Sequence, residues 1–124
     1  MRWAAQLGPE AMFEGLQAGE AVVLGLMSGS SLDGVDLCLA RFGYGPTRPW
    51  SYQILSARTI PYEQDLQERL RRAPLANRQE LLDLDVELGR WWALEINQLL
   101  QDRSGFGPHD APLLLASHGH TVDQ

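Results

Sequence analysis

The stretch VVLGLMSGSSLDGVDLCLARF at residues 22–42 decides how the rest of the chain is interpreted. Two apolar runs rich in Val and Leu flank a centre of Gly, Ser and Asp, a pattern that is typical of two strands joined by a tight turn. The turn gathers the hydroxyls of Ser28, Ser30 and Ser31 beside backbone amides. Because hydroxyls and amides bind phosphate oxygens, this hairpin is a candidate phosphate site.

Glycine and aspartate complete the turn. We expect Gly29 and Gly34 to take positive φ or to let a ligand approach the backbone closely. Asp33 and Asp36 place carboxylates near the same tip, where they can hold a hydrated magnesium ion or fix the turn. A turn of this composition is also common without any ligand, so a purely structural turn is the alternative interpretation.

The next segments predict a third strand and a first helix. Aromatic and branched residues alternate with polar ones at the start of Trp50–Ile60, which with the two preceding strands predicts a three-stranded antiparallel meander. Pro61 predicts the start of a helix that continues to about Arg72, and Pro74 closes it. Leu66 and Leu70 lie on one face of that helix.

A longer helix is predicted after the sequence Asn77-Arg78-Gln79-Glu80, which has the form of an N-terminal capping box. Gly89 within this helix indicates a close backbone approach, because glycine costs up to about 1 kcal/mol there relative to alanine. The Trp91-Trp92 pair is expected in the core or in a dimer contact rather than on a sugar. The apolar stripe of the helix comprises Leu81, Leu84, Leu88, Trp91, Trp92, Ile96 and Leu99.

The last segment combines an apolar run with a polar end. The run around Leu113–Ala116 has no alternation, which predicts a strand buried on both faces. Ser117, His118, Gly119, His120 and Thr121 follow it. Ligands of open α/β sheets bind at the carboxyl ends of strands, so these residues are candidates to contact a substrate. The alternative is a solvent-facing turn.

The composition is that of one globular domain with a hydrophobic core. A net charge of −6 and a sequence pI near 4.9 argue against a nucleic-acid or anionic-membrane partner. The short basic cluster of Arg69, Arg71 and Arg72 is expected to be a solvated helix end.

We expect neither a secretory signal nor a membrane-spanning segment in this sequence. Residues 1–20 contain three glutamates and no continuous apolar run, so they predict an extension with a short helix near Pro9–Gln17 rather than a secretory signal. No stretch is long and apolar enough to span a membrane. The single cysteine, Cys38, lies among apolar residues and is expected to be a buried thiol, which fits a reducing, cytoplasmic location.

Three segments resemble one known family, in the same order along the chain. The run GLMSGSSLDGVD at residues 25–36 closely resembles the N-terminal nucleotide-binding signature of the anhydro-N-acetylmuramic acid kinases. LLDLDVELGR at residues 81–90 resembles their helix, and SHGHTV at residues 117–122 resembles the segment that follows it. These enzymes are sugar kinases of the acetate kinase, Hsp70 and actin superfamily.

The resemblance implies a fold, a reaction and cofactors. The fold would be a ribonuclease H-like half-domain of α/β class, an incomplete actin-like ATPase lobe, with residues 21–124 as part of an N-terminal lobe and residues 1–20 as an extension. Family members use ATP and Mg²⁺ to convert 1,6-anhydro-N-acetylmuramic acid and water to N-acetylmuramic acid 6-phosphate in peptidoglycan recycling. The expected partner is this small amino sugar, and a second copy of the full-length protein is a further candidate, as a homodimer.

The resemblance also implies site residues. The candidates for the sugar are His118, Gly119, His120 and Thr121, and those for the metal are Asp33 and Asp36. The candidates for the ATP phosphates are Gly29, Ser30, Ser31, Leu32, Asp33, Gly34, Val35 and Asp36.

The chain also departs from the family pattern. Family members are much longer, and the aspartate that serves as their base lies in a motif beyond Gln124, so no residue of this chain is assigned as catalytic. Asp123 and Gln124 stand where the family usually has an aromatic residue and a histidine. An alternative is therefore a truncated, non-catalytic phosphate-binding or interaction fragment, with a phosphate-binding hydrolase as a third candidate. We also expect an exposed sheet edge, and hence association of the isolated chain.

Overall fold

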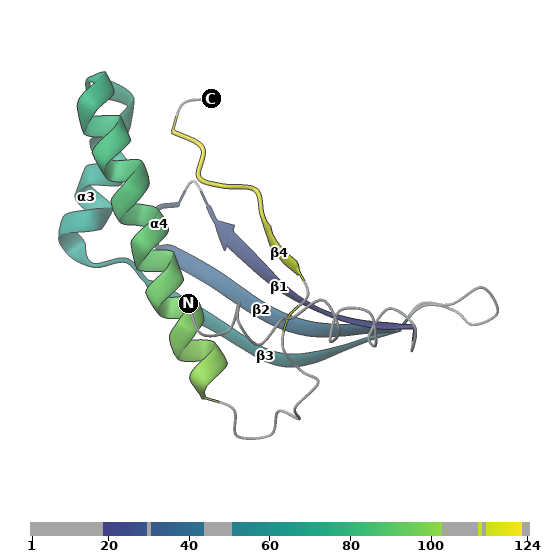
Figure 1. Cartoon of the computed structure of the whole chain (residues 1–124). Helices are drawn as coiled ribbons and strands as arrows, with labels where there is room; N and C mark the ends of the chain where they lie inside the picture. The colour runs from purple at the N-terminus through teal and green to yellow at the C-terminus, as the bar shows by residue number, and fades with distance from the viewer. Residues whose placement is uncertain (1–18, 30, 44–50, 103–111, 113, 123–124) are drawn as a thin grey trace.

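The computed structural model describes residues 19–29, 31–43, 51–102, 112 and 114–122. The described part is an α/β arrangement of one mixed sheet and two α-helices (Figure 1). Its elements are β1 (Glu20–Ser28), β2 (Gly34–Gly43), β3 (Ser51–Pro61), α3 (Gln64–Arg72), the short 3₁₀ helix η1 (Ala73–Leu75), α4 (Arg78–Gln101) and β4 (Leu114–Ser117).

The sheet has the strand order β3-β2-β1-β4. β1 pairs antiparallel with β2, and β2 pairs antiparallel with β3, which confirms the predicted meander. β4 returns to lie parallel to β1, with Leu26 opposite Ser117. The carboxyl ends of β1 and β4 therefore lie at the same end of the sheet. This arrangement brings together two segments that are distant in sequence.

One face of the sheet forms the core with the helices, and we call it the covered face. Buried side chains alternate with more exposed ones along β1 and β2, as expected of strands with one buried side. The buried set forms an apolar stripe on the sheet that faces α3 and α4. α4 runs across the strands (Figure 1). Its buried leucines and Ile96 belong to the same core cluster as the buried side chains of β1 and β2. The side chains of the stripe are Val22, Leu24, Leu26, Val35, Leu37 and Leu39, each at most 5% exposed.

No described helix covers the other face of the sheet, which we call the open face. Its large apolar side chains are exposed: Met27 56%, Phe42 37%, Tyr52 72%, Ile54 56% and Leu114 59%. The pairing registers place these residues on one side, because Met27 lies opposite Asp36, and Phe42 lies opposite Tyr52.

Two predictions about burial are wrong, each for its own reason. All four residues of β4 are exposed, whereas a strand buried on both faces was expected. Among the described strands, β4 lies at the edge of the sheet and pairs only with β1, so it lacks the second neighbouring strand that a fully buried strand has. Cys38 is half-buried rather than buried, because it lies on the open face opposite Ala57.

The helices confirm most of the local signals. Asn77 Oδ1 accepts the Glu80 amide at 2.9 Å, and the Asn77 amide donates to Glu80 Oε2 at 3.3 Å, which is the predicted capping box. α3 starts at Gln64 rather than at Pro61, because Pro61 is the last residue of β3 and pairs with Gly34.

The prediction of a close backbone approach at Gly89 is wrong. A Cβ built on Gly89 would have no neighbour within 4 Å, and the residue is exposed. Trp91 and Trp92 pack partly buried against the core, which confirms their place on the apolar stripe.

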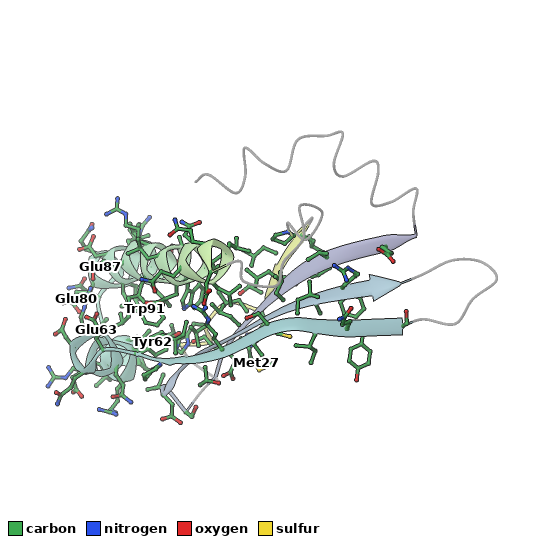
Figure 2. The ribbon with its side chains drawn as sticks, turned by 90° about the horizontal axis from the view of Figure 1, so that it is seen from below. Met27, Tyr62, Glu63, Glu80, Glu87 and Trp91 are labelled. Atoms are coloured by element: carbon green, nitrogen blue, oxygen red, sulfur yellow. The ribbon has the colours of Figure 1, made fainter. Side chains whose placement is uncertain are left out.

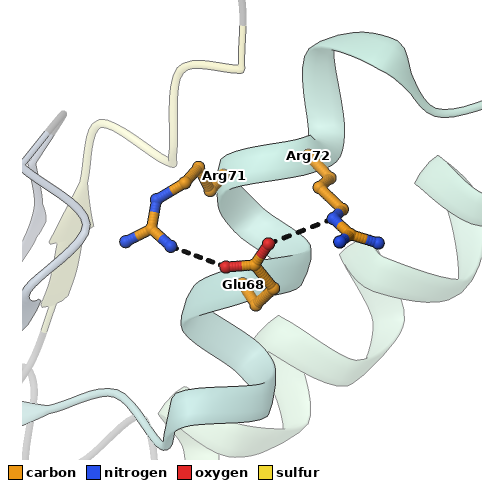
Figure 3. A network of polar contacts seen from close by, with 3 residues as sticks. All are labelled: Glu68, Arg71 and Arg72. Carbon is orange, nitrogen blue, oxygen red and sulfur yellow. Dashed lines mark hydrogen bonds and ion pairs between the residues drawn. The ribbon is translucent and has the colours of Figure 1, made fainter.

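The basic cluster is a solvated helix end, as predicted. Glu68 on α3 accepts hydrogen bonds from Arg71 at 2.6 Å and from Arg72 at 3.0 Å (Figure 3). Arg69 pairs with Glu87 on α4, which links the two helices. Exposed pairs of this kind contribute about 0–1 kcal/mol each, so they orient the helix ends more than they stabilise the fold.

The helix expected near Pro9–Gln17 lies outside the described residues. α4 itself ends at Gln101, and the Asp102 amide closes it on the Gln98 carbonyl at 3.1 Å. Within the described ranges, no helix combines the length and the hydrophobicity that crossing a membrane requires.

Candidate functional site

The turn between β1 and β2 takes its left-handed residue from an unexpected position. Leu32 has a φ of +59°, whereas neither Gly29 nor Gly34 has a positive φ. The Leu32 amide donates to the Gly29 carbonyl at 3.2 Å and closes the turn. A left-handed conformation costs a non-glycine residue roughly 1–2 kcal/mol. The partly buried Leu32 side chain packs on the core and holds the turn in this form.

Gly34 serves a different purpose from the predicted one. A Cβ at this position would lie 2.1 Å from the Ile60 carbonyl oxygen and 2.8 Å from Pro61 Cα. The residue therefore lets β3 approach β2, and no ligand is needed to explain the glycine.

Ser28 does not face solvent as a phosphate donor would. Its side chain lies on the covered face at the end of β1 and is 2% exposed. Its Oγ lies 2.6 Å from the Tyr62 hydroxyl and 2.8 Å from His120 Nδ1. Both contacts are within the protein, so the expectation that Ser28 reaches phosphate oxygens is wrong.

The remaining hairpin candidates divide by exposure. Gly29, Ser31 and Asp33 are exposed at the tip, where a ligand can reach them, whereas Ser30 lies outside the described residues. Val35 has a side chain that is 0% exposed, so it belongs to the core.

The two metal candidates differ in their surroundings. Asp36 is exposed and accepts a hydrogen bond from Thr59 Oγ1 at 2.7 Å across the sheet. Asp33 is exposed at the turn; its carbonyl accepts the Tyr62 amide at 3.1 Å, and its carboxylate has no hydrogen bond to any described residue. Among the described residues no group of three His, Cys, Asp or Glu side chains is arranged to hold a metal ion by itself.

The segment after β4 turns back toward the core. Gly119 has a φ of +74°, and its amide donates to Ser117 Oγ at 3.0 Å, which sets the bend. His118 and Thr121 are exposed, whereas His120 is half-buried. Val122 packs against the core and anchors the far side of the segment.

The contact between Ser28 and His120 joins the two predicted segments. The residues are 92 positions apart in sequence and meet because the parallel strands β1 and β4 finish at the same end of the sheet. Tyr62 extends these contacts into the core. Its hydroxyl contacts Ser28 and also accepts a hydrogen bond from Trp92 Nε1–H at 3.0 Å. Its ring lies against Trp91, with the ring centroids 4.9 Å apart (Figure 2).

Sequence reasoning missed Tyr62, although it is the centre of these contacts. It follows β3 and precedes α3, so it belongs to no periodic pattern that would mark it. A tyrosine that is 6% exposed needs a partner for its hydroxyl, but the sequence does not reveal which residue provides it.

The surroundings of His120 favour its uncharged form. Burial lowers the pKa of its imidazole, and the nearby His118 lowers that pKa further. A neutral imidazole has one N–H donor and one acceptor nitrogen, so it can bind an uncharged ligand group beside the turn between β1 and β2.

The site thus combines an exposed turn with a carboxylate, backbone amides and a neutral histidine at one edge of the sheet. Such an arrangement can bind a phosphate and hold a polar small molecule beside it. Groups of these kinds are what phosphoryl transfer requires, since positioning and electrostatics dominate that reaction.

Comparison with known proteins identifies the family of the chain. The family model described as "Anhydro-N-acetylmuramic acid kinase" matches residues 21–124. Anhydro-N-acetylmuramic acid kinases of Nitrosomonas europaea and Parasynechococcus marenigrum are 35% and 39% identical over 102 residues, which is 80% of this chain. These matches cover 26% and 25% of the two relatives, so the chain spans about a quarter of the length of the curated relatives it matches. The chain therefore belongs to the anhydro-N-acetylmuramic acid kinase family.

Proposed function

We propose that this chain is the N-terminal part of a kinase that converts 1,6-anhydro-N-acetylmuramic acid, water and ATP to N-acetylmuramic acid 6-phosphate and ADP. The family match supports the kinase activity. The observation that carries the proposal is the Ser28–His120 contact, because it joins the phosphate turn to the segment assigned to the sugar. The described part would be one ribonuclease H-like half of an actin-like lobe, with residues 1–20 as an extension.

The exposed tip of the hairpin would bind the ATP phosphates. Backbone amides around Gly29 and Ser31 are the proposed donors, because these residues are exposed at the turn. Gly34 and Val35 would support the turn from the sheet rather than touch the nucleotide, since Gly34 packs on β3 and Val35 is fully buried.

Asp33 fits a magnesium site better than Asp36. Magnesium is commonly held by one or two carboxylates together with substrate phosphates and water, so a three-residue cluster is not required. The Asp33 carboxylate is exposed and makes no hydrogen bond to a described residue, whereas Asp36 is engaged by Thr59. When bound, the ion would neutralise phosphate charge during the transfer.

The sugar would bind beside His118–Thr121, next to this turn. In the proposed reaction a water oxygen attacks the anomeric carbon, the bond from that carbon to O6 breaks, and O6 receives the γ-phosphoryl group. The proton of the attacking water passes to a base outside this chain. Substrate and product belong to peptidoglycan recycling, and a cytoplasmic location follows from the supply of ATP.

The test uses the whole native protein with Mg-ATP, the anhydro sugar and ¹⁸O-labelled water. We expect a sugar 6-phosphate that carries ¹⁸O at the anomeric carbon, detected by mass spectrometry. N-acetylmuramic acid without the anhydro bridge is the control substrate, because its phosphorylation would not require water at that carbon. An unphosphorylated sugar, or a product without the label, would contradict the proposed reaction.

A non-catalytic phosphate-binding fragment is the second candidate, and the exposure of Gly29, Ser31 and Asp33 at the turn favours it, because these residues alone would suffice to bind a phosphate. Isothermal titration with Mg-ATP, combined with the sugar phosphorylation assay on the native protein, separates the two. Phosphorylation of the anhydro sugar supports the kinase, whereas binding of Mg-ATP without phosphorylation supports the non-catalytic fragment. Hydrolysis of ATP without sugar would instead indicate a hydrolase.

A further inference from the structure

The hydrogen bonds between Trp92, Tyr62, Ser28 and His120 have a single consistent direction. The indole N–H of Trp92 can only donate, and the Tyr62 oxygen accepts it at 3.0 Å. The Tyr62 hydroxyl makes one other polar contact in the described part of the chain, to Ser28 Oγ at 2.6 Å. Tyr62 therefore donates to Ser28, because its own proton would otherwise be left without an acceptor among the described residues.

The same argument applies at Ser28. Its oxygen accepts the Tyr62 proton, and its own hydroxyl proton has His120 Nδ1 at 2.8 Å as the acceptor. Ser28 and Tyr62 are 2% and 6% exposed, so solvent does not replace either partner. A buried donor without a partner costs roughly 1–3 kcal/mol, which strongly favours the arrangement in which all three protons are accepted.

We propose that Trp92, Tyr62 and Ser28 are positioning residues that hold His120 as the neutral imidazole with its proton on Nε2, so that this N–H donates to an oxygen of the amino sugar. The ligand part of this inference rests on the proposed function, whereas the tautomer does not. The Nδ1 atom accepts from Ser28 and is therefore unavailable to a ligand. The Nε2 atom has no partner among the described residues, which leaves it as the donor of the site.

The lowered pKa of His120 agrees with this assignment, since burial and His118 both disfavour a charged ring. An uncharged donor suits a sugar hydroxyl or ring oxygen, which carries no charge to balance. The charged phosphate oxygens of ATP also accept hydrogen bonds, so the experiment includes an arm for each ligand.

The first test is nitrogen NMR of the chain labelled with ¹⁵N-histidine at neutral pH. We expect His120 Nδ1 in the range of an unprotonated ring nitrogen and Nε2 in the range of a protonated one. Loss of the signals in the His120→Asn variant assigns them, and the exposed His118 is the internal reference. A charged His120, or a proton on Nδ1, would overturn the proposal in the unaltered chain, without any dependence on variants.

The Ser28→Ala variant then tests what fixes the tautomer. Without the Ser28 hydroxyl we expect the two His120 tautomers to exchange, whereas Ser28→Thr retains the donor and the single tautomer. Ser51→Ala, on an exposed residue of β3, is the matched control and should leave the His120 signals unchanged. An unchanged tautomer in a folded Ser28→Ala chain would overturn the positioning role.

The ligand part is tested in the whole native protein. We expect the anhydro sugar, and not Mg-ATP alone, to shift the Nε2 signal of His120. His120→Gln keeps an N–H near the Nε2 position, so we expect its KM for the sugar to stay close to that of the native protein, whereas His120→Asn raises it by roughly tenfold. Equal KM values, or a shift with Mg-ATP alone, would overturn the sugar assignment. A protein that phosphorylates no sugar would refute the proposed function and leave the tautomer result standing.

Discussion

The two faces of the sheet are built from the same strands but differ in how they are packed. On the covered face, Leu24 and Leu37 are each 1% exposed beneath α3 and α4. On the open face, Met27 and Ile54 are each 56% exposed. Ser28 lies on the covered face, so the contacts that join the candidate site are anchored to the packed half of the molecule. The comparison teaches that the geometry of the site depends on the core, while the open face contributes little to it.

The largest expected difference is between two leucines. Leu24→Ala removes a buried side chain and should lower the free energy of unfolding by about 2–5 kcal/mol, because it leaves a cavity under the helices. Leu114→Ala on β4, 59% exposed, should change it by only about 0.5 kcal/mol. Urea denaturation followed by tryptophan fluorescence measures both. Equal losses would show that the two faces are packed alike.

Two glycines extend the comparison from side chains to the backbone. Gly34→Ala should destabilise the chain by about 1–3 kcal/mol, because the new methyl group would meet the Ile60 carbonyl. Gly89→Ala should stabilise it by up to about 1 kcal/mol, since it adds helix propensity where space is open. Thermal denaturation of both variants should show shifts of opposite sign, and shifts of the same sign would contradict this account of Gly34.

Two tyrosines compare the faces by their hydroxyls. Tyr62→Phe removes the partner of both Ser28 and Trp92 and should cost about 1–3 kcal/mol of stability. Tyr52→Phe, on a residue 72% exposed, is the matched control and should change stability by less than about 0.5 kcal/mol. Denaturant titration of both variants measures the free energy of unfolding. If Tyr62→Phe leaves that free energy unchanged, the role given to the Tyr62 hydroxyl in the site is contradicted.

The smallest expected effect is a pH dependence. The pKa of His120 is lowered in the folded chain, so the unfolded chain binds an extra proton as the pH falls below about 6.5. Stability from this group is therefore present above that pH and is lost as the pH falls through the folded pKa. His120→Asn should flatten this part of the stability profile, whereas His118→Asn should alter it less. Identical profiles for the native chain and His120→Asn would contradict the buried, neutral histidine.

Local signals in the sequence predicted much of the fold. The hairpin, the capping box at Asn77 and the buried leucines of the helices depend on residues close in sequence, and the structure confirms them. The exposure of β4 was not predictable, because an apolar run does not reveal whether a strand lies at an edge.

The sequence predicted which segments form the candidate site but not which side chains contact one another in it. Both segments were identified, but Ser28 was interpreted as a ligand donor because nothing local indicates that its side chain faces Tyr62. The Tyr62 contact spans 34 positions and depends on how β3 pairs beside the β1–β2 hairpin, whereas the His120 contact spans 92 and depends on how β4 returns beside β1. Tertiary pairings of this length lie outside any local pattern.

The central claim is that the turn between β1 and β2 and the segment after β4 are joined through Ser28 and His120, and a double-mutant cycle tests it most directly. The free energies of unfolding of Ser28→Ala, His120→Ala and the double variant give the coupling between the two residues. We expect a coupling of about 1 kcal/mol for this pair, and additive effects for the control pair Ser28→Ala and His118→Ala. Additivity within about 0.3 kcal/mol for Ser28 and His120 as well would contradict the account.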